Sequence, residues 1–197
     1  MPVYNVDGKN VLFVHIPKCG GTTIEYALSD YLVGFLDRKF KGDYFPCSPQ
    51  HFHKELLESI LNIAYFDLVF TIVRNPYDRI VSEYKWRKKY GNFEKTFDVW
   101  LKQQLDCVIE NPYHLDNHLR PMTDFMLPRT EIFRLEDGMG PAFEHISAVT
   151  GASFDAQAAK RNVMSSTNEQ IEMTADSKYL IQEYYMADLN VFGYQCP

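Results

Sequence analysis

Cysteine, positive charge and long apolar runs are all scarce in this chain. Its four cysteines are far apart and form neither a Cys-x-x-Cys pair nor a zinc-ligand spacing, which argues against a disulfide framework and a structural zinc site. We expect reduced thiols in a reducing compartment. The net charge of −6 argues against nucleic-acid binding, which favours a basic surface.

No stretch of about 20 apolar residues is present, and the polar segment 1–10 is not followed by the apolar core of a signal peptide. We therefore expect no membrane span and a cytoplasmic location. The length of 197 residues, 46% of them hydrophobic, favours a single domain over 1–197. Mixed strand and helix patterns indicate the α/β class. The oligomeric state cannot be inferred from the sequence.

The most informative segment is Phe13–Glu25, which reads FVHIPKCGGTTIE. The apolar run Val11–Ile16 predicts a short buried strand, and Pro17 ends it. Gly20 and Gly21 permit a tight turn in which the backbone approaches a ligand closely. The segment therefore predicts a strand followed by a glycine turn.

A helix is expected after this turn, with Thr22 or Thr23 as its capping residue. A strand, a glycine turn and a helix N-terminus together favour phosphate binding, because free amides and the positive end of the helix dipole face the anion. Lys18 adds a positive charge inside the turn. The order of residues differs from a Walker A loop, in which Lys follows the last Gly.

A second segment has the same strand-to-helix layout. The apolar run Phe66–Val73 predicts a buried strand, followed by Arg74 at its carboxyl end, where open α/β sheets bind their ligands. Asn75 is expected to cap a helix that begins at Pro76. Arg74 and Ser82 together offer a guanidinium and a hydroxyl, which suit a phosphate monoester.

The two motifs HIPKCGGTT and VRNPYDRIVSEY resemble the cofactor loops of the sulfotransferase superfamily, most closely its carbohydrate sulfotransferase branch and bacterial relatives. The resemblance implies a P-loop-like three-layer α/β fold, with a central, mostly parallel sheet flanked by helices. It also implies an enzyme that transfers a sulfonate group from 3′-phosphoadenosine 5′-phosphosulfate (PAPS) to a hydroxyl acceptor, a small molecule or glycan. Among these acceptors, we predict a carbohydrate.

The same resemblance assigns the cofactor loops. The first loop would bind the 5′-phosphosulfate and the second the 3′-phosphate. The residues implied are Pro17, Lys18, Cys19, Gly20, Gly21, Thr22, Thr23, Arg74 and Ser82. Cys19 departs from the small or hydroxylated residue that relatives often carry, which leaves the backbone cradle intact but assigns no side-chain contact there.

The transfer requires alignment of the reactants, stabilisation of charge on the leaving phosphate and removal of the acceptor's proton. Lys18 suits the second task. His51 and His53 lie between the two loops and resemble a segment that supplies a histidine base in some relatives, so we predict both as catalytic candidates. Glu25 and Glu55 are the alternatives. The reaction requires no metal, and the sequence shows no obvious metal-ligand cluster.

The acceptor is expected to contact a loop over residues 106–121. Within it, His118 and Arg120 resemble a late loop that approaches the acceptor in relatives, and we predict them as substrate-binding residues. A basic segment at 160–166 either closes over the 3′-phosphate or adenine or is simply solvated. Further helices are expected over 55–63, 93–105, 142–150 and 177–189, a strand over 131–135, and loops over 34–50 and 156–173.

Two other functions remain open at this point. A P-loop phosphotransferase would share the strand-loop-helix layout, but it needs a Walker Lys and a carboxylate for Mg²⁺ at a strand end, where this chain has Arg74. A non-catalytic nucleotide-binding module would keep the pocket without turnover.

Overall fold

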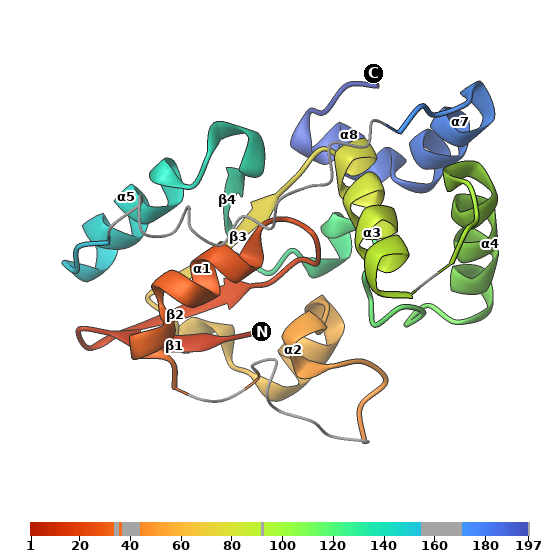
Figure 1. The fold of residues 1–197 in the computed structure, drawn as a ribbon. Coiled ribbons are helices and arrows are strands. Elements are labelled where there is room, and N and C mark those ends of the chain that lie inside the picture. The colour runs from red at the N-terminus through yellow and green to blue at the C-terminus, as the bar shows by residue number, and fades with distance from the viewer. Residues whose placement is uncertain (34–35, 37–43, 92, 155–170, 197) are drawn as a thin grey trace.

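The computed structural model describes residues 1–33, 36, 44–91, 93–154 and 171–196 (Figure 1). Its centre is a four-stranded sheet in the order β1-β2-β3-β4. The strands are β1 (Val3–Val6), β2 (Lys9–Val14), β3 (Leu68–Val73) and β4 (Glu131–Arg134). β1 pairs antiparallel with β2, whereas β2 with β3 and β3 with β4 are parallel. The predicted α/β class with a mostly parallel sheet is confirmed.

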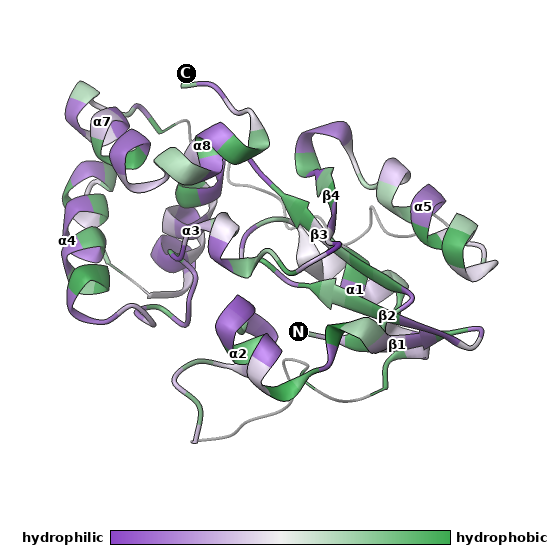
Figure 2. Ribbon diagram, turned by 180° about the vertical axis from the view of Figure 1, so that it is seen from behind, coloured by the Kyte–Doolittle hydropathy of each residue, from purple (hydrophilic) through white to green (hydrophobic). Residues whose placement is uncertain are grey.

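Helices flank this sheet, as the predicted P-loop-like architecture requires. They are α1 (Gly21–Ala27), α2 (Lys54–Ile60), α3 (Pro76–Gly91), α4 (Phe97–Glu110), α5 (Gly140–Thr150), α7 (Ala175–Tyr184) and α8 (Met186–Phe192). Figure 1 and Figure 2 both show α3, α4, α7 and α8 gathered beyond one end of the sheet. None of the helices in the described ranges is long and apolar enough to cross a membrane.

The core has two parts. Every residue of β3 is buried, as expected for a parallel strand covered on both faces, and Figure 2 shows β3 as hydrophobic. Around the sheet, buried side chains such as Phe70 and Phe125 form one cluster. A second cluster, which includes Tyr84, Trp100 and Leu101, joins α3, α4 and the C-terminal helices. The single-domain span stays a prediction.

The two helices that follow the motif strands begin differently. α3 begins at Pro76 as predicted, and Asn75 Oδ1 accepts a hydrogen bond of 3.0 Å from the amide two residues on. The predicted cap of α1 by Thr22 or Thr23 is wrong, because its N-cap is Gly20 with φ of 80°. Glycine reaches this left-handed conformation without the steric cost that a Cβ would add.

Several helices begin or end at residues other than those predicted. The helix predicted over 177–189 is two helices, α7 and α8, with a break at Tyr185. The helix predicted over 93–105 begins later, at Phe97, and runs to Glu110, so the start of the expected loop is helical. α2 ends at Ile60, short of its predicted end.

The strand β1 was not predicted. It forms a hairpin with β2 through Asp7 and Gly8, whose φ angles are 50° and 86°. An Asp-Gly pair is a known signal for such a two-residue turn. The predicted segment 160–166 and most of the expected loops 34–50 and 156–173 lie outside the described residues.

A buried carboxylate joins the C-terminal helix to the loop before β4. Asp188 of α8 is fully buried and accepts hydrogen bonds from the backbone amides of Met122 (2.8 Å) and Thr123 (2.9 Å). Asp188→Ala would leave both amides without this acceptor, and each lost bond to a charged group costs about 1.5–3 kcal/mol. We expect the free energy of unfolding in urea to fall by about 3 kcal/mol or more.

The matched control is Asp176→Ala, because Asp176 is exposed in the first turn of α7. Its loss should cost less than about 1 kcal/mol through the helix dipole. Equal losses in the two variants would show that the Asp188 contacts do not hold the C-terminal helix.

Candidate active site

The first motif loop runs from the end of β2 into α1 and has an unusual backbone. Lys18 and Gly20 have φ angles of 66° and 80°. A Cβ on Gly21 would lie 2.7 Å from Cε1 of His15, so only glycine fits against that imidazole. The predicted tight turn is therefore present, and the close approach of its backbone to a ligand stays a prediction.

The loop also leaves backbone donors open. The amides of Lys18, Gly20, Gly21 and Thr22 make no hydrogen bond to any residue that the structure describes. Unpaired amides at a helix start favour an anion. The Cys19 thiol, by contrast, is buried, and burial raises its pKa to about 12, so it is an inert packing group.

The second motif lies beside the first because β2 and β3 are parallel neighbours. Arg74, directly after β3, donates a hydrogen bond from Nη1 to the carbonyl of Lys18 at 3.2 Å. Ser82 lies half-buried in α3, and the structure shows no hydrogen bond between it and Arg74. The two motif segments thus adjoin each other because β2 and β3 are neighbouring parallel strands.

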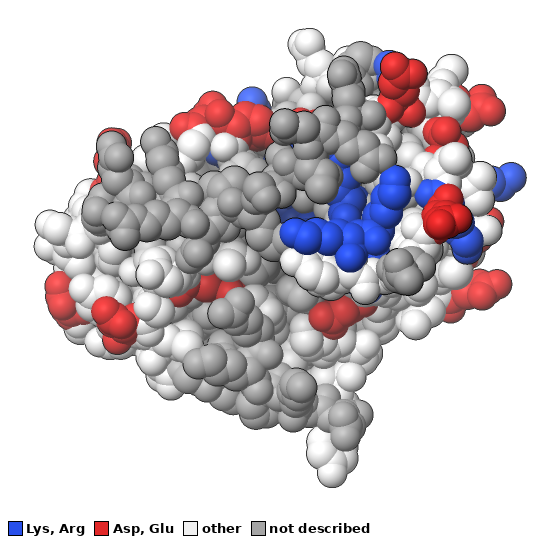
Figure 3. All heavy atoms as spheres, viewed as in Figure 1, with Lys and Arg blue, Asp and Glu red and all other residues white. Residues whose placement is uncertain are grey.

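Positive charge gathers around Lys18. Its Nζ lies 5.2 Å from the ring centroid of Trp86. Burial lowers the pKa of Lys18, the nearby Glu83 opposes this, and Arg74 with Arg87 adds to it. Figure 3 shows Lys and Arg side chains together on the face over α3. This basic face suits an anionic ligand at the first loop.

A buried arginine connects the first loop to the segment around His118. Arg79 of α3 is 2% exposed. Its Nε donates to the carbonyl of Pro17 at 3.0 Å, and its Nη2 donates to the carbonyls of His118 (2.9 Å) and Arg120 (2.8 Å). One guanidinium therefore fixes two loops that are about a hundred residues apart in the sequence.

The segment held by Arg79 has a strained backbone. Leu115, Asp116 and Asn117 have φ angles of 53°, 59° and 63°, a left-handed conformation that residues with a side chain adopt at a cost. The fully buried Asn117 donates from Nδ2 to the carbonyl of His51 at 2.9 Å. The strain is thus held in place by contacts that also set the position of Asp116.

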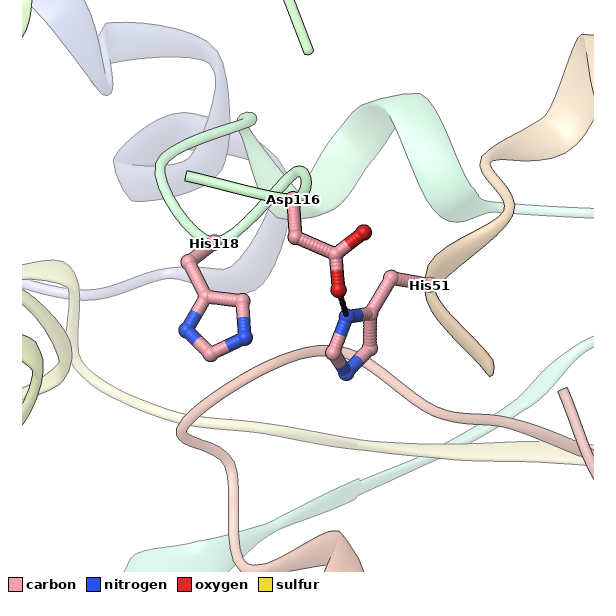
Figure 4. Close-up of side chains that lie close together, drawn as sticks. All are labelled: His51, Asp116 and His118. Atoms are coloured by element: carbon pink, nitrogen blue, oxygen red, sulfur yellow. Dashed lines mark hydrogen bonds and ion pairs between the residues drawn. The ribbon is translucent and has the colours of Figure 1, made fainter. Parts of the chain in front are cut away.

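His51 is held by a carboxylate. Its Nδ1 lies 2.7 Å from Oδ2 of Asp116 (Figure 4). The same oxygen accepts a hydrogen bond from the hydroxyl of Ser48 at 2.7 Å. Burial raises the pKa of Asp116, but the His51 and Ser48 contacts outweigh this and hold it well below its usual value. An ionised carboxylate only accepts, so Nδ1 of His51 carries the hydrogen and Nε2 is left as the base. Burial lowers the pKa of His51, although Asp116 opposes this.

His118 has the same arrangement. Its Nδ1 lies 2.8 Å from Oε2 of Glu83, and Nε of Arg87 donates to the other carboxylate oxygen at 2.7 Å. Its ring centroid is 4.8 Å from that of His51. Burial lowers the pKa of His118, against the effect of Glu83. The two imidazoles therefore lie edge to face in one group.

His15 is the third imidazole of the group. Its Nδ1 lies 2.6 Å from Oε1 of Glu25, to which Gln50 also donates at 2.6 Å. Its ring is 5.5 Å from that of His51 and rests on Gly21 of the first loop. Through His15, the histidine group is continuous with the open amides of the first loop.

The other predicted histidine lies apart from this group. His53 is buried at the start of α2, with Nε2 3.6 Å from Glu55 and its ring 5.8 Å from that of Tyr113. Arg120 donates to Asn117 and Asp124, at 3.0 and 3.1 Å. The structure thus brings Lys18, His51 and His118 around the first loop, while His53 and Arg120 have other partners.

Sequence reasoning missed the three carboxylates that hold the histidines. Asp116 stands two residues before His118, but it pairs with His51, and Glu83 pairs with His118 from another element. Glu25, the alternative base, lies 2.6 Å from Nδ1 of His15, and its role as a base stays a prediction. The one sequence signal was that Asp116 lies within residues 106–121, the segment predicted to contact the acceptor.

A phosphate-type loop, an adjoining arginine and a carboxylate-held histidine are features that suit group transfer from an anionic donor. The chain belongs to the sulfotransferase family, because the sequence model that describes this family matches residues 3–195. No curated protein and no solved structure matches the chain significantly. The resemblance stated from the two motifs is therefore confirmed at the level of the family.

Glu83 makes the stability of the protein depend on pH. Burial raises its pKa, but the contacts with His118 and Arg87 outweigh this and lower it to about 2 from 4.5. A depressed carboxyl pKa stabilises the fold above pH 4.5, and this contribution is lost as the pH falls toward 2. Between pH 6 and pH 3 the loss is about 2 kcal/mol.

We therefore expect Glu83→Gln to reduce the fall in unfolding free energy between pH 6 and pH 3 by about 2 kcal/mol, measured by urea unfolding. Glu131→Gln, on an exposed site of β4, is the control and should keep the wild-type pH dependence. The same pH dependence in Glu83→Gln and wild type would contradict the depressed pKa of Glu83.

Proposed function

We propose that this protein transfers the sulfonate group of PAPS to a hydroxyl group of a carbohydrate acceptor, with His51 as the base. Membership of the sulfotransferase family supports the reaction. The observation that carries the proposal is the histidine held by Asp116 beside the loop with open amides. One site would then both remove the proton of the acceptor hydroxyl and stabilise the negative charge of the leaving group.

The residues of the first loop fit an anionic donor. Gly21 has no room for a side chain beside His15, and the amides of Lys18, Gly20, Gly21 and Thr22 have no hydrogen-bond partner among the described residues. We propose that these amides, with Lys18, bind the 5′-phosphosulfate. Arg74 and Ser82 would bind the 3′-phosphate, which is supported by the position of Arg74 at the end of β3.

Each side chain then has a defined task. Nε2 of His51 would accept the proton of the acceptor hydroxyl, and Asp116 would stabilise the imidazolium that forms. Lys18 would stabilise negative charge on the oxygen that leaves sulfur, where a fixed cation costs no reorganisation. His118, next to His51, would contact the acceptor. The displacement occurs in line, so the acceptor must lie opposite the leaving oxygen.

Alternative bases have other roles in this proposal. Glu25 is engaged by His15 and Gln50, and Glu55 is exposed. His53 and Arg120 remain candidates at the acceptor side, although their present partners lie outside the histidine group. A cytoplasmic location is also a proposal, supported by four free thiols.

Two measurements decide the function. Calorimetry should show binding of 3′-phosphoadenosine 5′-phosphate and no comparable binding of ATP with Mg²⁺. A radiolabelled sulfonate assay with a library of hydroxyl acceptors should then show transfer. Preference for ATP with Mg²⁺ would support a phosphotransferase, and binding without transfer to any acceptor would indicate a non-catalytic module.

The second loop can be tested without an acceptor. Arg74→Ala should weaken binding of 3′-phosphoadenosine 5′-phosphate by about 1.5–3 kcal/mol while leaving adenosine 5′-phosphate nearly unchanged, because one charged contact to the 3′-phosphate is lost. Calorimetry measures both. Arg129→Ala, an exposed site, is the control. An unchanged ratio of the two affinities in Arg74→Ala would rule out this loop as the 3′-phosphate site.

Lys18 should act mainly in the transition state. We expect Lys18→Ala to lower kcat more strongly than it weakens binding of PAPS, since charge on the leaving oxygen develops only as the bond to sulfur breaks. Steady-state kinetics with varied PAPS measures both effects. A raised KM with unchanged kcat would mean that Lys18 only anchors the donor.

The base should be visible in the pH profile. Because burial lowers the pKa of His51, kcat/KM should rise through an apparent pKa below 6.5 as neutral imidazole forms. His51→Ala should remove that limb and reduce the rate by roughly 10²–10⁴, and His53→Ala should do much less. Retention of near-normal turnover in His51→Ala, with PAPS binding intact, would move the base elsewhere.

A further inference from the structure

The histidine group contains a set of metal ligands that the proposed transfer does not use as such. One ligand atom from each of His51, Asp116 and His118 lies within 4.8 Å of the others. Figure 4 shows the three side chains converging, with the ring of His118 turned toward the pair formed by His51 and Asp116. Their spacing in the sequence gave no sign of this, because His51 is 65 residues from Asp116.

The ligands are also held in the manner of a metal site. Metal-binding histidines typically donate their other ring nitrogen to a carboxylate, which fixes the ring. Glu83 does this for Nδ1 of His118, and Arg87 in turn holds Glu83. Nε2 of His118 makes no hydrogen bond to any described residue. The bond to Glu83 therefore sets the tautomer of His118 and leaves Nε2 as the ring nitrogen that can bind a metal.

The remaining two ligand atoms are already adjacent. Nδ1 of His51 and Oδ2 of Asp116 are 2.7 Å apart, with one hydrogen between them. Zinc bonds to nitrogen and oxygen are about 2.0–2.2 Å long, so two ligands of one tetrahedral zinc lie roughly 3.3 Å apart. A small separation of the pair, and a closing movement of the His118 side chain, would complete the site.

We propose that His51, Asp116 and His118 bind one zinc-type divalent cation. Two imidazoles and one carboxylate favour zinc or cobalt over magnesium and calcium, which prefer oxygen ligands. Three protein ligands leave a fourth position for water. On binding, the bond between Nδ1 of His51 and its hydrogen is replaced by a bond to the metal, and one proton leaves to solvent.

The site has a consequence that rests on the proposed function. A cation bound to Nδ1 of His51 replaces the hydrogen bond between this nitrogen and Asp116. It also places positive charge in the same ring as the base nitrogen, Nε2. The imidazole then accepts no proton from the acceptor. Zinc therefore acts as an inhibitor of the transfer and is no cofactor of it.

Calorimetry on the full chain with zinc chloride alone tests the site. We expect one zinc per chain and release of about one proton, from the dependence of the binding heat on the ionisation heat of the buffer. Glu83→Gln should weaken zinc binding roughly 10–100-fold, and His118→Ala, which removes a ligand, should weaken it more strongly. His145→Ala is the control, because His145 lies on α5 against Phe133, away from the group, and it should bind zinc like the wild type.

Spectroscopy on the unmodified chain keeps the test valid if a variant fails to fold. Cobalt bound at this site should show ligand-field bands without a thiolate charge-transfer band, and zinc X-ray absorption should show nitrogen and oxygen neighbours at about 2.0–2.2 Å. A thiolate band would place the metal on a cysteine, and unchanged affinity in folded His118→Ala would remove His118 from the site. Either result overturns the proposal.

The inhibition is measured separately. If the chain transfers sulfonate, saturating zinc should abolish turnover and a chelator should restore it. Full turnover with zinc bound would contradict its position on His51. If no transfer is found with any acceptor, the proposed function fails, while calorimetry and spectroscopy still decide the metal site.

Discussion

The buried guanidinium of Arg79 is the interaction on which the arrangement of the site depends. It reaches from α3 to the carbonyl of Pro17 in the first loop and to the carbonyls of His118 and Arg120. A buried charge of this kind is costly, and donation from Nε and Nη2 to several carbonyls offsets part of that cost, although Nη1 has no partner among the described residues. It therefore fixes the phosphate-type loop and the loop over residues 115–120, called the histidine loop below, relative to each other.

The strained backbone of the histidine loop follows from the same constraint. Leu115, Asp116 and Asn117 all lie in the left-handed region, which costs of order 1–3 kcal/mol per residue. Contacts made by Arg79 and by the buried Asn117 hold this conformation. This conformation places Asp116 against His51. The strained backbone of one loop therefore orients a side chain of another segment.

The sequence predicted those features that depend on local rules. The strands before the two motifs, the helix that starts at Pro76 and the tight turn at Gly20 follow from apolar runs, proline and glycine. The structure adds that the two motif loops are neighbours, because their parallel strands end at the same edge of the sheet. The cap of α1 was missed because a glycine in the left-handed conformation replaced the expected side-chain cap.

The carboxylate partners of the histidines could not be predicted, because they are contacts between segments far apart in the chain. His51 pairs with Asp116, and His118 pairs with Glu83. No periodicity or spacing links such pairs, and they depend on how Arg79 and Asn117 join the loops. The separation of His53 from His51 likewise depends on the short turn before α2, which puts their rings among different partners.

The central claim is that the first loop and the histidine group form one site. The most direct test is imidazole ¹⁵N resonance spectroscopy of the wild-type chain during titration with 3′-phosphoadenosine 5′-phosphate. The account predicts that the ligand shifts the signals of His15 and His51, with Nδ1 of His51 protonated, and leaves His145 unchanged. Saturation of the ligand site without a shift at His15 or His51 would contradict it.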